Sequence, residues 1–277
     1  MVRMASVWDR SSAVLSGRGA MLAAIAAPTL FLPGVIRAGY IWATTPIGGG
    51  PAPVSAAIGG LLGIVVALVS LWGQLALIAA SSAPETQGPD ARRIATARFL
   101  PALGVMVVLV VALTLLALPP LFVMARAGFD FAAAAAGTQQ LAVAPGAAAF
   151  AGLYILVLGI VLLFVGARLA LTYAVIVNER LALGAIGRSW RLTRRHTWRI
   201  VGVLLLWVVV LLVATWATQA VVGTLLGLLL GREGVATVLF VTAIATAAVS
   251  TVFSVIAIVF TTQLYVALAA QRRAADG

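Results

Sequence analysis

Six long apolar stretches divide this 277-residue chain, and the gaps between them contain arginine in an alternating pattern. Each stretch reaches the ~20 residues that a helix needs to cross about 30 Å of hydrocarbon. The stretches cover residues 20–43, 58–80, 99–124, 149–172, 199–230 and 235–270. A chain that is 63% hydrophobic and only 9% charged is also far from the composition of a soluble domain. The sequence therefore predicts an all-α polytopic bundle of six transmembrane helices.

All 18 basic residues are arginines, and most of them lie in every second gap. This group precedes the first stretch or follows the second, fourth or sixth: Arg3, Arg10, Arg18, Arg92, Arg93, Arg98, Arg180, Arg188, Arg191, Arg194, Arg195, Arg199, Arg272 and Arg273. The opposite gaps contain only Arg126 and Arg232. Because cytoplasmic loops of membrane proteins carry an excess of positive charge, this pattern predicts that both termini are cytoplasmic.

Little of the chain lies outside the six stretches, so we expect one integral membrane domain over residues 1–277, ending in a short cytoplasmic tail at 271–277. The exclusive use of Arg over Lys, with abundant Ala, Val and Leu, is typical of a GC-rich bacterial genome and predicts the inner membrane. The net charge of +11 belongs to segments that border the apolar stretches. It therefore favours anionic lipid headgroups as partners over nucleic acid.

The second, fourth and sixth stretches end in similar sequences, in which Gln74, Arg168 and Gln263 are each followed by Leu at nearly equal spacing. Basic segments also precede the odd-numbered stretches, at residues 8–18, 90–98 and 188–199. This weak internal symmetry predicts three helical-hairpin units, each with a cytoplasmic interfacial amphipathic helix. The units cover about residues 1–80, 81–174 and 175–270. Coincidence between Leu- and Ala-rich helices is the alternative explanation.

Polar side chains within the apolar stretches are the usual markers of a transport path. Gln74 and Gln263 are instead expected to form hydrogen bonds between helices. Arg168, close to the predicted cytoplasmic surface, is expected either to pair with Glu179 or to extend its charged group to that surface. Four prolines can kink the first and third stretches and open a cleft: Pro28, Pro33, Pro119 and Pro120. These features leave a transporter or lipid-moving protein as an alternative function.

The segment 179–199 is predicted to form one amphipathic helix on the cytoplasmic surface. At about 100° per residue, four arginines share one side, Arg194 lies at its edge, and Leu183, Ile186 and Trp190 lie opposite. Tryptophan suits the headgroup layer, because its ring can be buried while its N–H stays hydrated. The candidate lipid-headgroup residues are Arg188, Trp190, Arg191, Arg194, Arg195, Trp198 and Arg199. A helix that only orients and anchors the chain is the alternative.

The inventory of reactive side chains predicts that the chain is not an enzyme. It contains no Cys, one His (His196) and seven acidic residues, none of which lies in the middle of an apolar stretch. A metal-dependent hydrolase needs several carboxylates or histidines held together, and the sequence has no Gly-x-Ser-x-Gly elbow, P-loop or zinc-ligand spacing. We therefore expect no catalytic residue, no metal and no cofactor.

Residues 171–205 contain Asn178-Glu179-Arg180, then the run from Arg188 to Thr193, and then Trp198-Arg199-Ile200. This part resembles the membrane domain of bacterial glycerophosphoryl diester phosphodiesterases, and the rest of the chain resembles it in the number of spans. The resemblance implies a multi-helix membrane domain whose own activity is unassigned, because the family is named for a fused catalytic domain that has no counterpart in these residues. The expected function is thus a non-catalytic membrane module that interacts with lipid or docks a protein partner.

Overall fold

The computed structural model of the protein describes residues 4–44, 53–135, 144–194, 196–231 and 234–276, and all of its regular elements are helices. The elements are α1 (Met4–Ala26), the π-helical segment η1 (Ala27–Phe31), α2 (Leu32–Thr44), α3 (Pro53–Ser82), α4 (Gly88–Arg126), α5 (Phe131–Ala135), α6 (Pro145–Leu169), α7 (Thr172–Glu179), α8 (Gly184–Thr193), α9 (Thr197–Leu230) and α10 (Val235–Asp276). Arg3, Arg195 and Arg232 lie outside the described residues.

Six helical segments are long and apolar enough to cross a membrane, as predicted. They are Met4–Thr44, Val54–Ser82, Gly88–Arg126, Pro145–Glu179, Thr197–Leu230 and Val235–Ala274. With 29 to 41 residues each, they exceed the ~20 residues that span the hydrocarbon, so their ends extend beyond it. The protein is therefore an all-α, multi-pass membrane protein.

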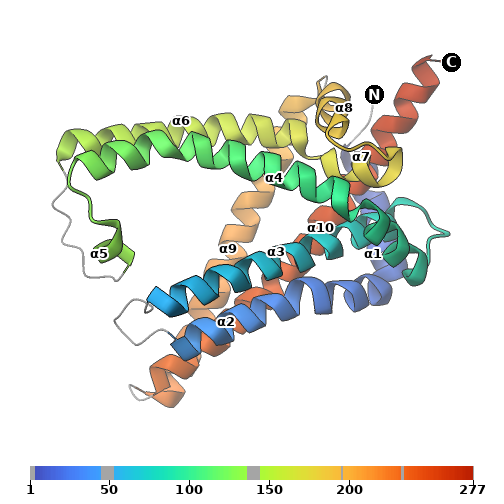
Figure 1. The fold of residues 1–277 in the computed structure, drawn as a ribbon. Coiled ribbons are helices and arrows are strands. Elements are labelled where there is room, and N and C mark those ends of the chain that lie inside the picture. Colours follow the sequence, from blue (N-terminus) through green and yellow to red (C-terminus); the bar gives the residue numbers. More distant parts are fainter. Residues whose placement is uncertain (1–3, 45–52, 136–143, 195, 232–233, 277) are drawn as a thin grey trace.

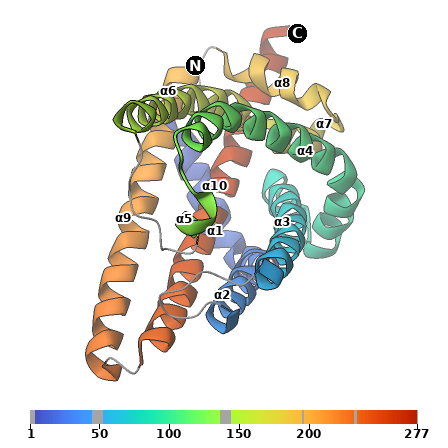
Figure 2. The same ribbon diagram turned by 60° about the vertical axis from the view of Figure 1, so that its left-hand side comes forward.

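Neighbouring helices form a closed ring, in which α3 packs on α4, α4 on α6, α6 on α9, α9 on α10 and α10 on α3. Helices α1 and α2 pack against α3 and α10. Figure 1 shows the hairpin of α4 and α6 apart from the group of α2, α3 and α10, with α9 crossing the space between them, and in Figure 2 α9 lies at the left edge of the molecule. Both termini, α7 and α8 lie at one end of the bundle, which is called the basic end below (Figure 1).

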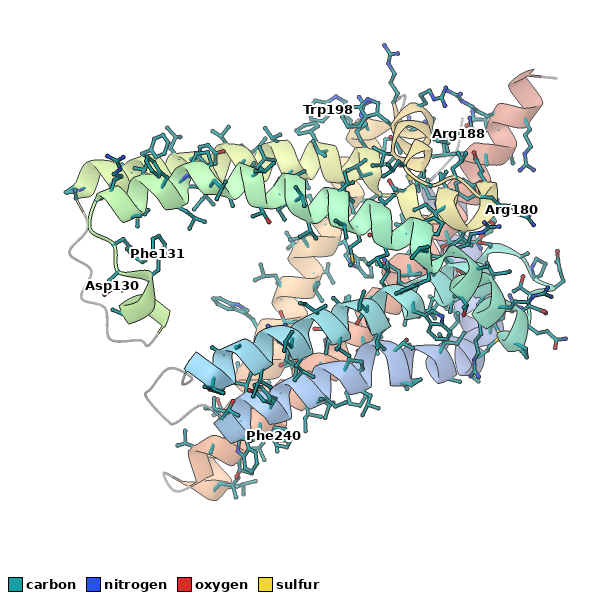
Figure 3. All side chains as sticks on the ribbon, in the orientation of Figure 1. Asp130, Phe131, Arg180, Arg188, Trp198 and Phe240 are labelled. Carbon is teal, nitrogen blue, oxygen red and sulfur yellow. The ribbon has the colours of Figure 1, made fainter. Side chains whose placement is uncertain are left out.

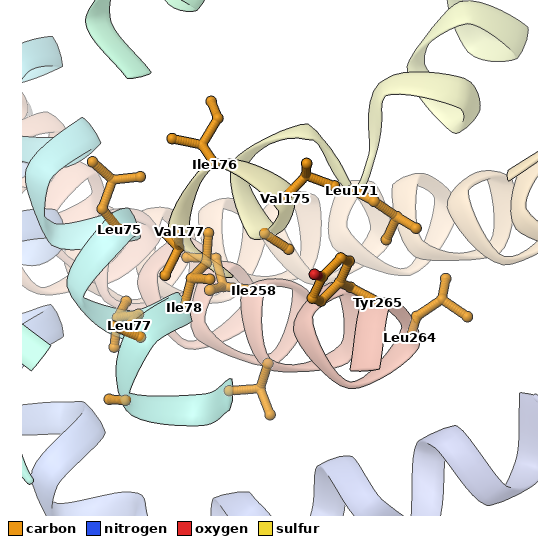
Figure 4. Close-up of a cluster of buried hydrophobic side chains, with 14 of the residues drawn as sticks. Leu75, Leu77, Ile78, Leu171, Val175, Ile176, Val177, Ile258, Leu264 and Tyr265 are labelled. Carbon is orange, nitrogen blue, oxygen red and sulfur yellow. The ribbon is translucent and has the colours of Figure 1, made fainter. Parts of the chain in front are cut away.

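The buried side chains of the protein gather near the basic end. Leu75, Leu171, Ile176 and Leu264, which come from α3, α7 and α10 and the turn before α7, are almost completely buried (Figure 4). In contrast, only 6–11% of the most apolar window of the second to sixth spans is buried. Apolar side chains gain little from leaving hydrocarbon, whereas the same side chains near water must be covered. The distribution of burial thus fits helices that leave the membrane at the basic end.

Hydrogen bonds across the basic end join helices that are distant in sequence. Arg18 of α1 donates from its guanidinium group to the carbonyl oxygens of Ala80, Ala83 (2.8 Å) and Thr86. These carbonyls belong to the last turn of α3 and the connection that follows it, where no helical N–H is available to them. Arg18 therefore fixes α1 to the end of α3.

The predicted interhelix hydrogen bond of Gln263 is confirmed. Its Nε2 atom donates to the carbonyl oxygen of Ser81 over 2.7 Å, and its side chain is buried. The same prediction is wrong for Gln74, which is half-buried and has no side-chain hydrogen bond with the part of the chain that the structure describes. The two glutamines occupy matching places in the sequence but face different neighbours.

The first span changes its helical geometry at Pro28, as a proline inside a span predicts, because η1 begins at the preceding residue. Thr29 of η1 lies against Gly73 of α3 so closely that a Cβ atom on Gly73 would be 2.1 Å from the Thr29 hydroxyl oxygen. Only glycine fits at this contact. In the third span, α4 continues without interruption through Pro101, Pro119 and Pro120.

Of the three predicted interfacial helices, one is a separate helix among the described residues, and its position at a membrane surface stays a prediction. Helix α8 is a separate short helix at the basic end. The other two basic segments, residues 8–18 and 90–98, lie within α1 and α4 and continue directly into spans. The α10 helix likewise continues to Asp276, so most of the predicted tail is helical.

Candidate functional site

A corner of three helices replaces the single helix predicted over residues 179–199. Helix α7 ends at Glu179, α8 covers Gly184–Thr193 and α9 begins at Thr197. Arg180 adopts the left-handed conformation, with φ of 59°, which ends α7 and reverses the chain. The expected continuous arginine face is therefore wrong, because its members are distributed over two helices, and Arg195 lies outside the described residues.

Helix α8 is held against the end of α6 by a side-chain hydrogen bond. Ser189 Oγ donates to the carbonyl oxygen of Arg168 over 2.7 Å, while the Thr193 hydroxyl lies 3.3 Å from the same oxygen and closer, at 2.9 Å, to the carbonyl oxygen of Ser189. The last carbonyls of a helix have no intrahelical partner, so the Ser189 hydroxyl satisfies one of them. The buried face of α8 consequently contains Ala185, Ser189, Leu192 and Thr193 rather than the predicted face with Trp190.

The carboxylate of Glu179 binds Arg188 and not Arg168, so the first of the two alternatives predicted for Arg168 is not formed, and the extension of its charged group to the membrane surface stays a prediction. Arg188 Nε lies 2.8 Å from Glu179 Oε2, and the Tyr265 hydroxyl donates to Oε1 over 3.1 Å. The guanidinium group of Arg168 instead lies over the Trp190 ring, 4.9 Å from its centroid. Arg188, on α8 in Figure 3, thus already forms an ion pair within the protein and is a weaker candidate for binding a lipid headgroup.

The other described candidates remain exposed at the basic end. Arg191, Arg194 and Arg199 are exposed, and so is Trp198, with 76% of its surface accessible (Figure 3). Glu179 is the single acidic residue between positions 145 and 231, and it is already paired. Within the described ranges these three arginines therefore have no carboxylate partner. They give the end of α8 and the start of α9 a positive surface.

A cavity of about 420 Å³ lies beside this surface, between the end of α6 and the connection from α8 to α9. Its lining contains Phe164, Arg168, Arg194, His196, Thr197, Trp198 and Arg199. The sequence had grouped Arg194, Trp198 and Arg199 but not Phe164 and Arg168, which are about 30 positions from Trp198 and are connected to it by no spacing pattern. Their meeting depends on the packing of α6 against both α8 and α9.

Two aromatic contacts hold the walls of this cavity in place. The rings of Phe164 and Trp198 meet edge to face with centroids 5.0 Å apart, and Trp190 supports the Arg168 guanidinium group. Among the residues that the structure describes, no group of three or more His, Cys, Asp or Glu side chains could hold a metal ion. The chemistry of the site is that of positive charge beside aromatic and apolar surface, which fits an anion with an apolar attachment.

The chain belongs to the family of the domain of unknown function DUF7847, whose family model matches residues 6–271. Comparisons with curated proteins and with solved structures found no match. Because the family description states no activity, a function has to be inferred from the site itself. The resemblance to the membrane domain of glycerophosphoryl diester phosphodiesterases stays a prediction.

Proposed function

We propose that this protein is a non-catalytic integral membrane module that binds anionic phospholipid headgroups at the cytoplasmic face of a bacterial inner membrane. The observation that carries the proposal is the position of Arg191, Arg194 and Arg199. These arginines are exposed and lack a carboxylate partner among the described residues, and Arg194 and Arg199 lie just before and just after the start of α9. Trp198 beside them has the amphipathic ring that the headgroup layer favours.

The electrostatics of the surface support this proposal. An arginine near an anionic membrane surface contributes about 1 kcal/mol of attraction. Salt largely screens this attraction when the arginine lies farther than a Debye length from the lipid charges. Arginines that contact headgroups directly keep more of their effect in salt than arginines that act from a distance.

The test is the lipid composition that remains bound to the purified protein. From a membrane with equal anionic and zwitterionic lipid, the wild type should retain mainly anionic lipid, measured by mass spectrometry. The variant Arg191→Gln/Arg194→Gln/Arg199→Gln should lose most of this preference at physiological salt, with each charge worth about fivefold at low salt.

The matched control removes three charges elsewhere at the basic end, as Arg92→Gln/Arg93→Gln/Arg98→Gln in α4. This control should keep the preference at physiological salt, because screening leaves only direct contacts. A wild type that retains lipids in the proportions of the membrane would overturn the proposal. Equal losses in the two variants would also contradict it, since they would mean that only overall charge matters.

A second candidate function is lipid movement between the two leaflets. In both views the ends of α4 and α6 near α5 lie apart from the ends of α2 and α3 (Figures 1 and 2). The most apolar windows of α3 and α6 are also only 6% buried. A fluorescent-lipid scrambling assay in vesicles separates the candidates. A binding module leaves the scrambling rate at that of protein-free vesicles, whereas a lipid-moving protein accelerates it.

A further inference from the structure

The cavity at the α6–α8–α9 corner has the dimensions of a built ligand site. Its volume of about 420 Å³ lies within the range of about 300–1,000 Å³ that is common for small-molecule sites. Its lining comes from three places in the chain, with Arg168 on α6, Arg194 just after α8 and Arg199 in the first turn of α9. Three arginines from different elements thus line one cavity.

The positive charge of this cavity is not neutralised by the described part of the protein. Glu179, the one nearby acid in the sequence, is held by Arg188 and Tyr265. The first-turn N–H groups of the 34-residue helix α9 begin at the same wall, and they add a partial positive charge. An anion that enters the cavity therefore gains direct contacts without displacing an existing ion pair.

Part of the cavity wall is held by contacts within the protein. The Arg168 carbonyl oxygen accepts a hydrogen bond from the Ser189 hydroxyl, and the Arg168 guanidinium group lies over the Trp190 ring. Phe164 and Trp198 are in contact with each other and form an apolar side of the cavity. Preorganised walls lower the entropy that binding has to offset, which favours recognition of a specific group over loose attraction.

We propose that this cavity binds a phosphate monoester group, such as the headgroup of a phosphatidic-acid-like lipid. A monoester presents close to two negative charges and three terminal oxygens, which can accept bidentate hydrogen bonds from more than one arginine. A phosphodiester headgroup has one charge and two free oxygens and so satisfies fewer of the arginines. This inference rests on the proposed function and names the lipid class that the site selects.

The apolar side of the cavity favours a lipid over free phosphate. Phe164 and Trp198 line the cavity, and the exposed apolar surfaces of α6 and α9 continue from them along both helices. A ligand with acyl chains can place its phosphate among the arginines while its chains lie along these helices. Inorganic phosphate shares the charged contacts but gains nothing from the apolar surface.

The test is to titrate the intact protein in detergent with four probes and to measure the affinity for each by calorimetry. Short-chain phosphatidic acid should bind at least about tenfold more tightly than short-chain phosphatidylglycerol, because of the additional charge-assisted hydrogen bonds. Phosphatidylcholine should bind weakest among the lipids. Inorganic phosphate should compete with phosphatidic acid, but only at concentrations at least about tenfold higher.

A site variant and a control variant are compared, and thermal unfolding checks that both still fold. Arg194→Gln/Arg199→Gln changes two exposed side chains and should weaken phosphatidic acid binding about tenfold or more, with unchanged thermal unfolding. The control Arg92→Gln/Arg93→Gln removes the same charge from exposed positions of α4 and should change the affinity less than about threefold.

Each outcome gives a different answer. Equal affinity for phosphatidic acid and phosphatidylglycerol, both lowered by the site variant, would overturn the monoester site but leave the anionic-lipid function intact. Equal effects of the two variants would overturn the cavity as the site. Phosphate binding as tight as that of phosphatidic acid would assign the cavity to free phosphate and overturn the lipid assignment. If no anionic lipid bound better than phosphatidylcholine, both proposals would fail.

Discussion

Arg18 makes the most extensive side-chain contact between α1 and the rest of the basic end, and its replacement by glutamine tests how that end is held together. The guanidinium group of Arg18 donates to three carbonyl oxygens at and after the end of α3. A hydrogen bond that involves a charged group contributes about 1.5–3 kcal/mol. Because Arg18 is only half-buried, water replaces part of what is lost. We therefore expect Arg18→Gln to lower the free energy of unfolding by about 2–3 kcal/mol.

The loss can be measured by titrating the purified protein with sodium dodecyl sulfate in mixed micelles and following its tryptophan fluorescence. Arg10→Gln on the same helix is the control, since Arg10 is exposed and donates only to the local carbonyl oxygen of Ser6. The control should cost less than about 0.5 kcal/mol. Arg18→Lys retains the charge but offers fewer directed donors, so its cost should fall between the two. A cost of Arg18→Gln no larger than that of the control would refute the role assigned to Arg18.

Three further changes test other parts of the structure. Gln263→Leu removes the hydrogen bond from α10 to α3 and leaves a buried carbonyl oxygen without its donor, so it should cost about 1–3 kcal/mol in the same titration, and a neutral effect would contradict this contact. Glu179→Gln removes the ion pair between Glu179 (22% exposed) and Arg188 (27% exposed), so the free energy of unfolding should fall by about 1 kcal/mol at low salt and by less at high salt. A decrease independent of salt would argue against an electrostatic role. A reporter enzyme that is active only outside the cell should be active when fused after Gly231 and silent when fused after Gln87, and the reverse pattern would contradict the predicted orientation.

The number of spans and the helical class could be read from the sequence because the membrane imposes a length and a composition on each span separately. Any apolar run of about 20 residues must become a helix to satisfy its own backbone within hydrocarbon. This constraint is local, so it does not depend on how the helices pack. The extension of α1, α4 and α10 beyond the hydrocarbon was not predicted, since basic residues at a span end are compatible with a bend as well as with a straight helix.

The candidate site could be predicted only in part. The exposed arginines and Trp198 were found from composition and position, because charged residues beside an apolar span belong at the membrane surface. The periodicity of residues 179–199 nevertheless predicted the wrong helix. A left-handed Arg180 ends α7, and a residue other than glycine adopts that conformation only when its surroundings favour it. The backbone preference of arginine therefore does not predict a turn at Arg180.

The sequence by itself determined that this protein has six helices long and apolar enough to cross a membrane and that its arginines gather in alternate gaps, since both properties depend on the composition of each segment. Only the tertiary structure decided which polar groups meet. It paired Glu179 with Arg188 and left Arg194 and Arg199 at a shared cavity with Arg168. These contacts join helix ends distant in sequence, and their geometry depends on the angles at which the helices pack, which no local pattern of residues specifies.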